Sequence, residues 1–239
     1  MSGAELSRLV RELRARAEST EPLDWGPSPA AGPASAAADA PPAAEALSRL
    51  KAQVEACRRC PLGATRLHPA FGVGSPSAAV LFIGEGPGRE EDHRGEPFVG
   101  KAGQLLDKIL ESVGLSRETV YIANIVKCHP MVDPSDPEKR GNDRPPTPAE
   151  TQACRGWLEE QIRILRPRCI VALGGVSAKF LLQTPEGISR LRGRWARYGP
   201  DGIPLMPTYH PAALLRDPGL KRDVWNDMKS VKKSLEEGA

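Results

Sequence analysis

The chain has 239 residues and is 40% hydrophobic, enough for one sizeable α/β domain with a core, plus a tail. No apolar stretch approaches the ~18 residues of a membrane span, and no hydrophobic run opens the chain. We therefore expect a cytoplasmic protein. The formal net charge is +3, with −3 on residues 1–46 and +6 on residues 47–239. Charge alone leaves open a polyanionic partner or an ordinary solvated surface.

The first 45 residues differ in composition from the rest. Leu6, Leu9, Val10 and Leu13 recur at helical spacing within residues 4–18, and a stretch dense in Pro, Ala and Gly follows. The sequence predicts a short amphipathic helix and a flexible linker over residues 1–45, and one globular domain over residues 46–239.

Four apolar, β-prone runs alternate with helical segments in that domain. The runs cover residues 78–85, 119–128, 169–175 and 203–211, and the helical segments cover residues 101–114, 147–165 and 175–183. Continuous apolar strands separated by helices are typical of a parallel sheet covered on both faces. We predict an α/β fold, a three-layer α/β/α sandwich with a central, mostly parallel four-stranded sheet. Ligand sites in such sheets lie off the carboxyl ends of the strands.

Four of the five cysteines suggest a metal centre. Cys57 and Cys60 form a Cys-x-x-Cys pair, and Cys128 and Cys154 are dispersed at a predicted strand end and in a predicted helix. Such a set can ligate zinc or a [4Fe–4S] cluster, and the dispersed thiols favour the larger cluster. The spacing also leaves open that Cys128 and Cys154 are simply buried. Cys169 begins a predicted strand and is expected in the core.

The loop "GEGPGREED" follows the first predicted strand. Its glycines outline a phosphate cradle, but Gly86 and Gly88 are too close for the dinucleotide fingerprint, and acidic residues would repel a pyrophosphate. The glycines could instead let the backbone approach a neutral group while Glu85 or Glu91 handles a water molecule. Alternatively, the acidic run is the solvated start of a helix.

Three further side chains are candidates for a ligand site: Asn124 and His210 fall at the same predicted rim, and Phe98 lies in the polar loop after the acidic run. Phe98 could seal an edge of the core or stack on a base. Asn124 lies in an apolar run, where its amide could hold a loop or read a ligand with paired donor and acceptor edges. His210 stands where a strand ends and a helix begins, and it is the histidine best placed at the rim.

Together these residues resemble family-4 uracil-DNA glycosylases, the iron–sulfur type of that superfamily. The matching pieces, in the family's order over residues 50–235, are "CRRCPL", "GEGPGREED", "GEPFVGKAGQLLDKIL", "YIANIVKC", "TPAETQAC", "ALGG" and "TYHPAALLR". The resemblance implies a DNA repair enzyme that hydrolyses the N-glycosidic bond of uracil and leaves an abasic site. It also implies a [4Fe–4S] cluster held by Cys57, Cys60, Cys128 and Cys154.

The resemblance assigns roles to the rim residues. Phe98 would stack on the flipped uracil, Asn124 would bond its N3–H and O4 edge, and backbone around Gly86 would contact the base. His210 would stabilise charge on uracil O2. Glu91, ranked slightly above Glu85, would position the water or support the sugar cation.

The resemblance also implies contacts with DNA. Leu214, Leu215 and Arg216 would form the loop that wedges into the duplex as the base leaves. The partner would be uracil-containing DNA, single- or double-stranded, which implies a nucleoid-associated protein. We expect a monomer that does not bind membranes, with a tail available to an unknown protein partner.

The loop over residues 129–146 departs from the family, because it is longer than the usual proline-rich linker. A related subgroup that traps its product covalently has a reactive histidine there, whereas no histidine follows Lys139 and Arg140, so ordinary turnover is expected. The alternative to an enzyme is a non-catalytic iron–sulfur DNA-binding module. A zinc-binding structural protein is the third interpretation.

Overall fold

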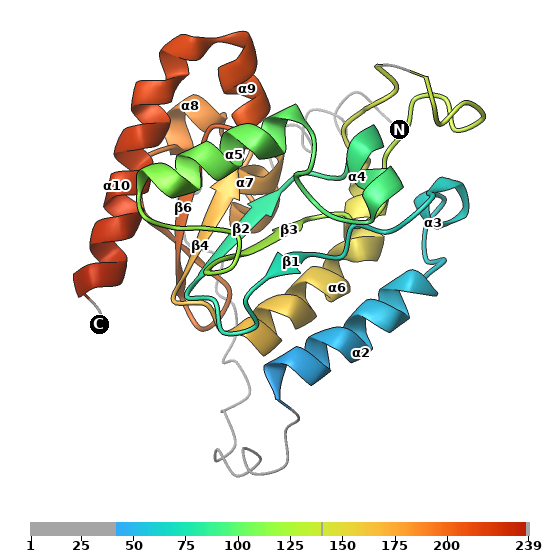
Figure 1. Cartoon of the computed structure of the whole chain (residues 1–239), viewed down its shortest axis with the longest axis horizontal. Helices are drawn as coiled ribbons and strands as arrows, with labels where there is room; N and C mark the ends of the chain where they lie inside the picture. Colours follow the sequence, from blue (N-terminus) through green and yellow to red (C-terminus); the bar gives the residue numbers. More distant parts are fainter. Residues whose placement is uncertain (1–41, 140, 238–239) are drawn as a thin grey trace, which may run out of the picture. The chain divides into compact units, whose positions relative to one another are not determined.

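One six-stranded sheet, in the order β1-β3-β2-β4-β6-β5, organises the computed structural model (Figure 1). The structure describes residues 42–139 and 141–237. The four central strands are mutually parallel. They are β3 (Tyr121–Asn124), β2 (Val80–Gly84), β4 (Cys169–Leu173) and β6 (Ile203–Thr208). These correspond to the four apolar runs, and the predicted parallel sheet is confirmed.

Two short edge strands were not predicted. β1 (Val73–Gly74) pairs antiparallel with β3, and β5 (Ala196–Tyr198) pairs antiparallel with β6. The prediction of four strands is therefore corrected to six. Strands of two and three residues, none of them fully buried, are too short to show an apolar period in the sequence.

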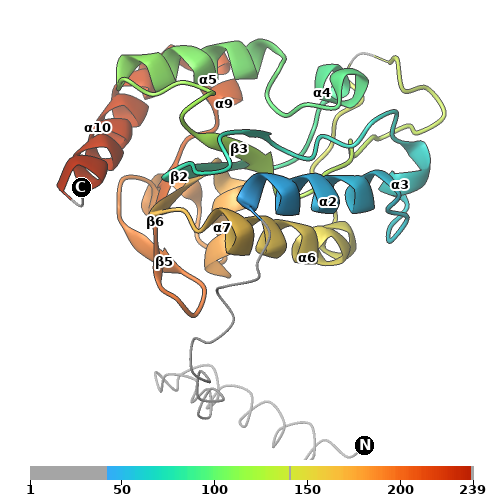
Figure 2. The same cartoon turned by 60° about the horizontal axis from the view of Figure 1, so that its bottom comes forward.

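Helices cover both faces of the sheet, which confirms the predicted three layers (Figure 2). One face packs against α2 (Ala43–Glu55), α6 (Pro148–Leu165) and α7 (Gly175–Leu182). The opposite face packs against α5 (Lys101–Ser112), α9 (Pro211–Arg216) and α10 (Lys221–Glu237). The remaining helices are α3 (Leu62–Thr65), α4 (Arg89–Arg94), α8 (Ile188–Leu191) and the 3₁₀ turn η1 (Pro218–Leu220).

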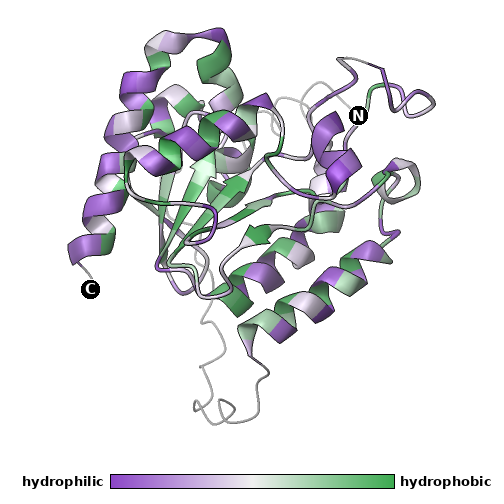
Figure 3. Ribbon diagram, in the orientation of Figure 1, coloured by the Kyte–Doolittle hydropathy of each residue, from purple (hydrophilic) through white to green (hydrophobic). Residues whose placement is uncertain are grey.

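Each central strand contributes to two cores. In β2, Leu81 and Ile83 face α2 and α6, whereas Val80 and Phe82 face α5 and α10. Because successive side chains point to opposite faces, burial on both sides requires the uninterrupted apolar runs seen in the sequence. Figure 3 shows these strands as the hydrophobic centre of the domain.

A capping box forms the start of α6. Thr147 Oγ1 accepts a hydrogen bond from the Glu150 backbone N–H at 3.2 Å, and Glu150 Oε2 accepts one from the Thr147 N–H at 2.7 Å. Two backbone donors that the helix cannot satisfy internally are thereby paired. This fixes where the loop over residues 129–146 joins α6.

The predicted helix over residues 4–18 lies outside the described residues, and the division of the chain at residue 45 stays a prediction. Within the described part, α2 begins at Ala43. No helix of residues 42–139 and 141–237 is long and apolar enough to cross a membrane.

Candidate functional site

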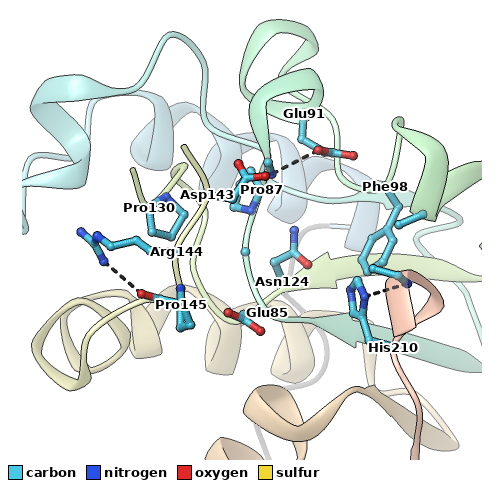
Figure 4. Close-up of a pocket in the computed structure, with 14 residues that line it drawn as sticks. Glu85, Pro87, Glu91, Phe98, Asn124, Pro130, Asp143, Arg144, Pro145 and His210 are labelled. Atoms are coloured by element: carbon cyan, nitrogen blue, oxygen red, sulfur yellow. Dashed lines mark hydrogen bonds between the residues drawn. The ribbon is translucent and has the colours of Figure 1, made fainter. Parts of the chain in front are cut away.

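A cavity of about 360 Å³ lies where three central strands end (Figure 4). β2 ends at Gly84, β3 at Asn124 and β6 at Thr208, so the carboxyl edge of the sheet forms its floor. The six residues predicted for chemistry or base contact all line it: Glu85, Gly86, Glu91, Phe98, Asn124 and His210. Segments up to 125 positions apart in the chain are thus brought together by the sheet topology.

Asn124 is a fully buried side chain of this cavity whose polar atoms have no partner among the described residues. It is 1% exposed, and neither its Nδ2 nor its Oδ1 has a hydrogen-bond partner among the described residues. A buried amide without partners costs about 1–3 kcal/mol for each polar group left unmatched. The arrangement therefore indicates a ligand that supplies one donor and one acceptor.

Phe98 is fixed by the close approach of backbone around it. A Cβ on Gly84 would lie 2.4 Å from Asn124 Oδ1 and 2.5 Å from Phe98 Cζ, so glycine is required at that strand end. A Cβ on Gly103 of α5 would lie 1.7 Å from the Phe98 carbonyl oxygen. Phe98 itself has a left-handed backbone with φ of +57°, and Arg117 donates a hydrogen bond to its carbonyl. A strained residue held by its surroundings is a feature of functional sites.

His210 has a defined tautomer. Its Nδ1 accepts a hydrogen bond from the Ala212 backbone N–H at 3.1 Å, which caps α9, so the neutral ring carries its proton on Nε2. The ring retains some solvent exposure inside the cavity, but desolvation by the surrounding protein, with a smaller contribution from Arg216, lowers the pKa of His210 to about 4. Its centroid lies 5.5 Å from that of Phe98. His210 is therefore a neutral hydrogen-bond donor at physiological pH.

The carboxylate of Glu91 is occupied by backbone groups. It accepts hydrogen bonds from the N–H groups of Gly88 at 3.1 Å and of Val99 and Gly100 at 2.9 Å each. Two of these donors follow Phe98 directly, and the third precedes α4. Glu91 thus ties the loop after β2 to the turn that carries Phe98.

Glu85 differs from Glu91 in having no such partner. No hydrogen bond or ion pair joins its carboxylate to another described side chain or backbone group, and it lines the cavity directly after β2 (Figure 4). Partial burial raises the pKa of Glu85 above its ordinary value of 4.5. Of the two carboxylates, that of Glu91 already accepts three backbone hydrogen bonds, whereas that of Glu85 accepts none from the described residues.

The far wall of the cavity was missed in the sequence. Pro130, Asp143, Arg144 and Pro145 form it, all from the long loop over residues 129–146. Buried His129 pairs through Nε2 with Asp143 Oδ1 at 2.6 Å. A signal was present, because this loop leaves the carboxyl end of β3 and so starts at the predicted rim.

Arg144 anchors this wall to α6. It donates two hydrogen bonds to the Glu150 carboxylate, at 2.7 and 2.8 Å. The same Glu150 is the N3 residue of the capping box. The wall is therefore fixed to a helix.

The three residues predicted to wedge into DNA are not equivalent. Leu214 is 1% exposed and packs in the core with α5 and α10, so it cannot leave α9 to enter a duplex. Leu215 is 49% exposed, and Arg216 is also exposed. Of the predicted set, Leu215 and Arg216 lie at the surface and Leu214 does not, because successive side chains of a helix point about 100° apart. Contact of Leu215 and Arg216 with DNA stays a prediction.

The four cysteines predicted as ligands line a second, smaller cavity. Cys57 and Cys60 follow α2, Cys128 follows β3, and Cys154 lies on α6. No three His, Cys, Asp or Glu side chains of residues 42–139 and 141–237 are placed to share one metal ion. Thiols that share a cavity without sharing one point suit a multi-iron cluster, whose ligands bind separate iron atoms, better than a single zinc.

The surroundings of the thiols fit an anionic, sulfur-containing group. Arg66 Nη1 donates to Cys128 Sγ at 2.9 Å, and the Lys127 backbone N–H donates to Cys154 Sγ at 3.3 Å. Trp157 also lines this cavity, and its buried Nε1–H has no partner among the described residues. Burial raises the pKa of the Cys128 thiol to about 11, while Arg66 opposes the shift. Cys169 lies in the other core, as predicted.

Comparisons with known proteins agree with this geometry. The family model of the uracil DNA glycosylase superfamily matches residues 71–229. A type-4 uracil-DNA glycosylase of Archaeoglobus fulgidus is 38% identical over 197 residues, which cover 78% of this chain and 92% of the relative. The type-4 enzyme of Thermotoga maritima is 39% identical over 194 residues, covering 79% and 94%.

A more distant relative is the type-5 uracil-DNA glycosylase of Thermus thermophilus. It is 32% identical over 163 residues, which cover 60% of this chain and 68% of the relative. The match thus extends beyond one type but is stronger for type 4. The chain belongs to the uracil DNA glycosylase superfamily, as one of its type-4 members.

Proposed function

We propose that this protein is a uracil-DNA glycosylase, which hydrolyses the N-glycosidic bond of uracil flipped out of DNA and leaves an abasic site. The relatives' names support this activity. The observation that carries it is the buried Asn124 amide, which has no partner for either its donor or its acceptor.

Asn124 supplies the base selectivity. Its Oδ1 accepts from uracil N3–H, and its Nδ2 donates to uracil O4. Cytosine presents an acceptor at N3 and donors at N4, the reverse pattern. A site built to form these bonds rejects a base that leaves its polar groups unpaired.

Phe98 and His210 bind the same base from other directions. The Phe98 ring stacks on the uracil face, a contact worth about 1–3 kcal/mol. The neutral His210 ring donates its Nε2–H to uracil O2, where negative charge develops as the bond breaks. A fixed donor in a desolvated cavity stabilises that charge without reorganisation.

Glu85 handles the water, and Glu91 positions the site. The C1′–N1 bond breaks with its electron pair leaving on uracil, the water oxygen bonds to C1′, and the released proton passes to Glu85. This assignment reverses the ranking expected from the sequence, because Glu91 is committed to three backbone N–H groups. The backbone around Gly86 contacts the base.

The uracil enters the cavity by leaving the base stack of the DNA. This extrusion costs a few kcal/mol, and it costs least for a mismatched or unpaired base. Exposed Leu215 on α9 fills the gap left in the duplex, and Arg216 contacts phosphate. The charge of +6 on residues 47–239 supports binding to single- or double-stranded DNA.

The four cysteines hold a [4Fe–4S] cluster. Bound there, the cluster supplies a cross-link between α2, the end of β3 and α6, not a step in the hydrolysis. Arg66 and Lys127 compensate its negative charge, and Trp157 Nε1–H supplies a further donor. We further propose a monomer that acts at the nucleoid, with the N-terminal tail as a contact for a protein partner.

One assay tests the function. The full-length chain, Asn124→Ala, His210→Ala and the control Asn226→Ala, an exposed amide on α10, are compared for release of free uracil from uracil-containing DNA. Release by wild type and the control, with a loss on the order of 100-fold or more in the other two, supports the proposal. Equal activity in all four would remove the site assignment. No activity in any, with DNA binding retained, would favour a binding module.

A further inference from the structure

Lys127 is buried completely, an uncommon position for an ammonium group. Its side chain has 0% exposure. It contacts Asn124 of the 360 Å³ cavity, called here the base cavity, and it lines the smaller cavity of Cys57, Cys60, Cys128 and Cys154, called here the cysteine cavity. A buried lysine is tolerated only when hydrogen bonds and opposite charge replace the lost water. Hydrogen-bond acceptors are present on one side of Lys127, and cysteine thiols, which a bound cluster would make anionic, are present on the other.

On the side of the base cavity, the ammonium contacts the residue that reads the base. Lys127 Nζ donates to the Asn124 backbone carbonyl at 2.8 Å and to Gln161 Oε1 at 2.5 Å. Gln161 Nε2 donates in turn to the Phe71 carbonyl at 2.9 Å. The Asn124 side chain has no hydrogen bond of its own, so its orientation depends on the backbone that Lys127 holds.

On the other side, Lys127 belongs to the cysteine cavity. It precedes Cys128, its backbone N–H donates to Cys154 Sγ at 3.3 Å, and its side chain is one of the cavity's walls. The charged groups around the ammonium are Cys154 and Cys128. With a cluster bound, their sulfurs would supply the negative charge that balances it. A single side chain therefore connects the two sites.

We propose that Lys127 is a positioning residue that couples the cysteine-bound cluster to base recognition, by holding the Asn124 backbone against the charge of the cluster ligands. The inference rests on the proposed function. It assigns the cysteine centre a role beyond cross-linking the fold. The cluster ligands balance the charge of the ammonium, and the ammonium sets the position of the Asn124 amide. Gln161 completes the arrangement from α6.

The test measures affinity for free uracil, a readout separate from turnover. Wild type, Lys127→Met, Gln161→Met and Lys233→Met, an exposed lysine on α10, are compared in full-length, cluster-loaded protein. We expect the Kd for uracil to rise about tenfold or more in Lys127→Met and about threefold in Gln161→Met, as expected for losing a hydrogen bond to a charged group. Visible absorbance per chain stays at the wild-type value, and Lys233→Met is unchanged.

If Lys127→Met does not retain its cluster, the Kd of Gln161→Met for uracil tests the inference instead. Gln161 contacts the ammonium and no cysteine. A Kd within twofold of wild type in loaded Gln161→Met overturns the inference, as does loss of visible absorbance in both variants. Uracil excision by wild type is measured alongside. An active wild type with unchanged variants removes only the coupling, whereas a wild type that neither binds nor excises uracil removes the proposed function.

Discussion

The base cavity and the cysteine cavity meet the two ends of one five-residue segment, 124–128, yet the side chains at those two ends differ in their hydrogen bonding. In the base cavity, both amide atoms of Asn124 are left without partners. In the cysteine cavity, Cys128 and Cys154 already receive hydrogen bonds from Arg66 and Lys127. In a site for an exchanging ligand, the ligand supplies the hydrogen-bond partners of the buried polar atoms. In a site for a permanently bound group, the protein already holds the donors that compensate the negative charge of that group.

Glu85→Gln is expected to have the largest effect and to act on the base cavity alone. Removing the general base should lower kcat by about 10²–10⁴-fold, with visible absorbance unchanged. The control is Asp143→Asn, which alters a cavity carboxylate already bonded to His129. Steady-state kinetics of both variants decide, and equal losses would contradict the assignment to Glu85.

Cys154→Ala tests the cysteine cavity. We expect it to lose most bound iron and visible absorbance and several kcal/mol of folding stability, because ligand binding contributes directly to folding. Cys169→Ala, a buried thiol in the opposite core, should keep its iron and lose only about 1 kcal/mol. Iron analysis and thermal unfolding check this, and normal iron content in Cys154→Ala would exclude it as a ligand.

Glu91→Gln separates positioning from chemistry within the base cavity. The amide oxygen could still accept from Val99 and Gly100, but the NH₂ group would meet the Gly88 N–H, so the free energy of unfolding should fall by about 1–3 kcal/mol. KM should rise more than kcat falls, because the turn carrying Phe98 loosens. Urea unfolding and kinetics measure both, and a loss of kcat matching Glu85→Gln with normal stability would restore Glu91 as the water-handling group.

The pH dependence of excision gives the smallest expected change. Burial raises the pKa of Glu85 above 4.5, so activity should fall as the pH drops through this raised pKa and the carboxylate is protonated. Burial lowers the pKa of His210 to about 4, so the ring should add no inflection near 6.5. Its contribution to stability is present above pH 6.5 and is lost as the pH falls towards 4. A kcat profile of wild type and His210→Asn with the same acid limb confirms this, whereas an inflection near 6.5 only in wild type contradicts it.

The sequence predicted the floor of the base cavity, because apolar runs locate parallel strands and their carboxyl ends meet at one edge. Glu85, Asn124 and His210 were found in this way. The role of Glu91 was hidden, since its helix begins after Gly88, which has no side chain to mark a helix start. The burial of Leu214 beside exposed Leu215 was hidden too, because six residues of α9 are too few to show a helical period.

The far wall could not be predicted because an irregular loop has no periodicity to interpret. Its residues are placed by contacts distant in sequence, such as His129 with Asp143 and Arg144 with Glu150. The two edge strands escaped for a related reason, since their pairing depends on neighbours and not on an apolar pattern of their own.

The loop over residues 129–146, which forms the far wall of the base cavity, is closed near its two ends, and residues 132–142 form its tip. Met131 and Asp143 form a β-bridge, and the Val132 N–H donates to the Asn142 carbonyl at 2.8 Å. The described residues of the tip, 132–139 and 141–142, do not line the cavity. The entropy of closing a loop grows only with the logarithm of its length. The tip contacts α4, where Glu138 pairs with Arg89 and His93. Insertions elsewhere in the tip are a place where the chain can diversify its contacts while the base cavity keeps its shape.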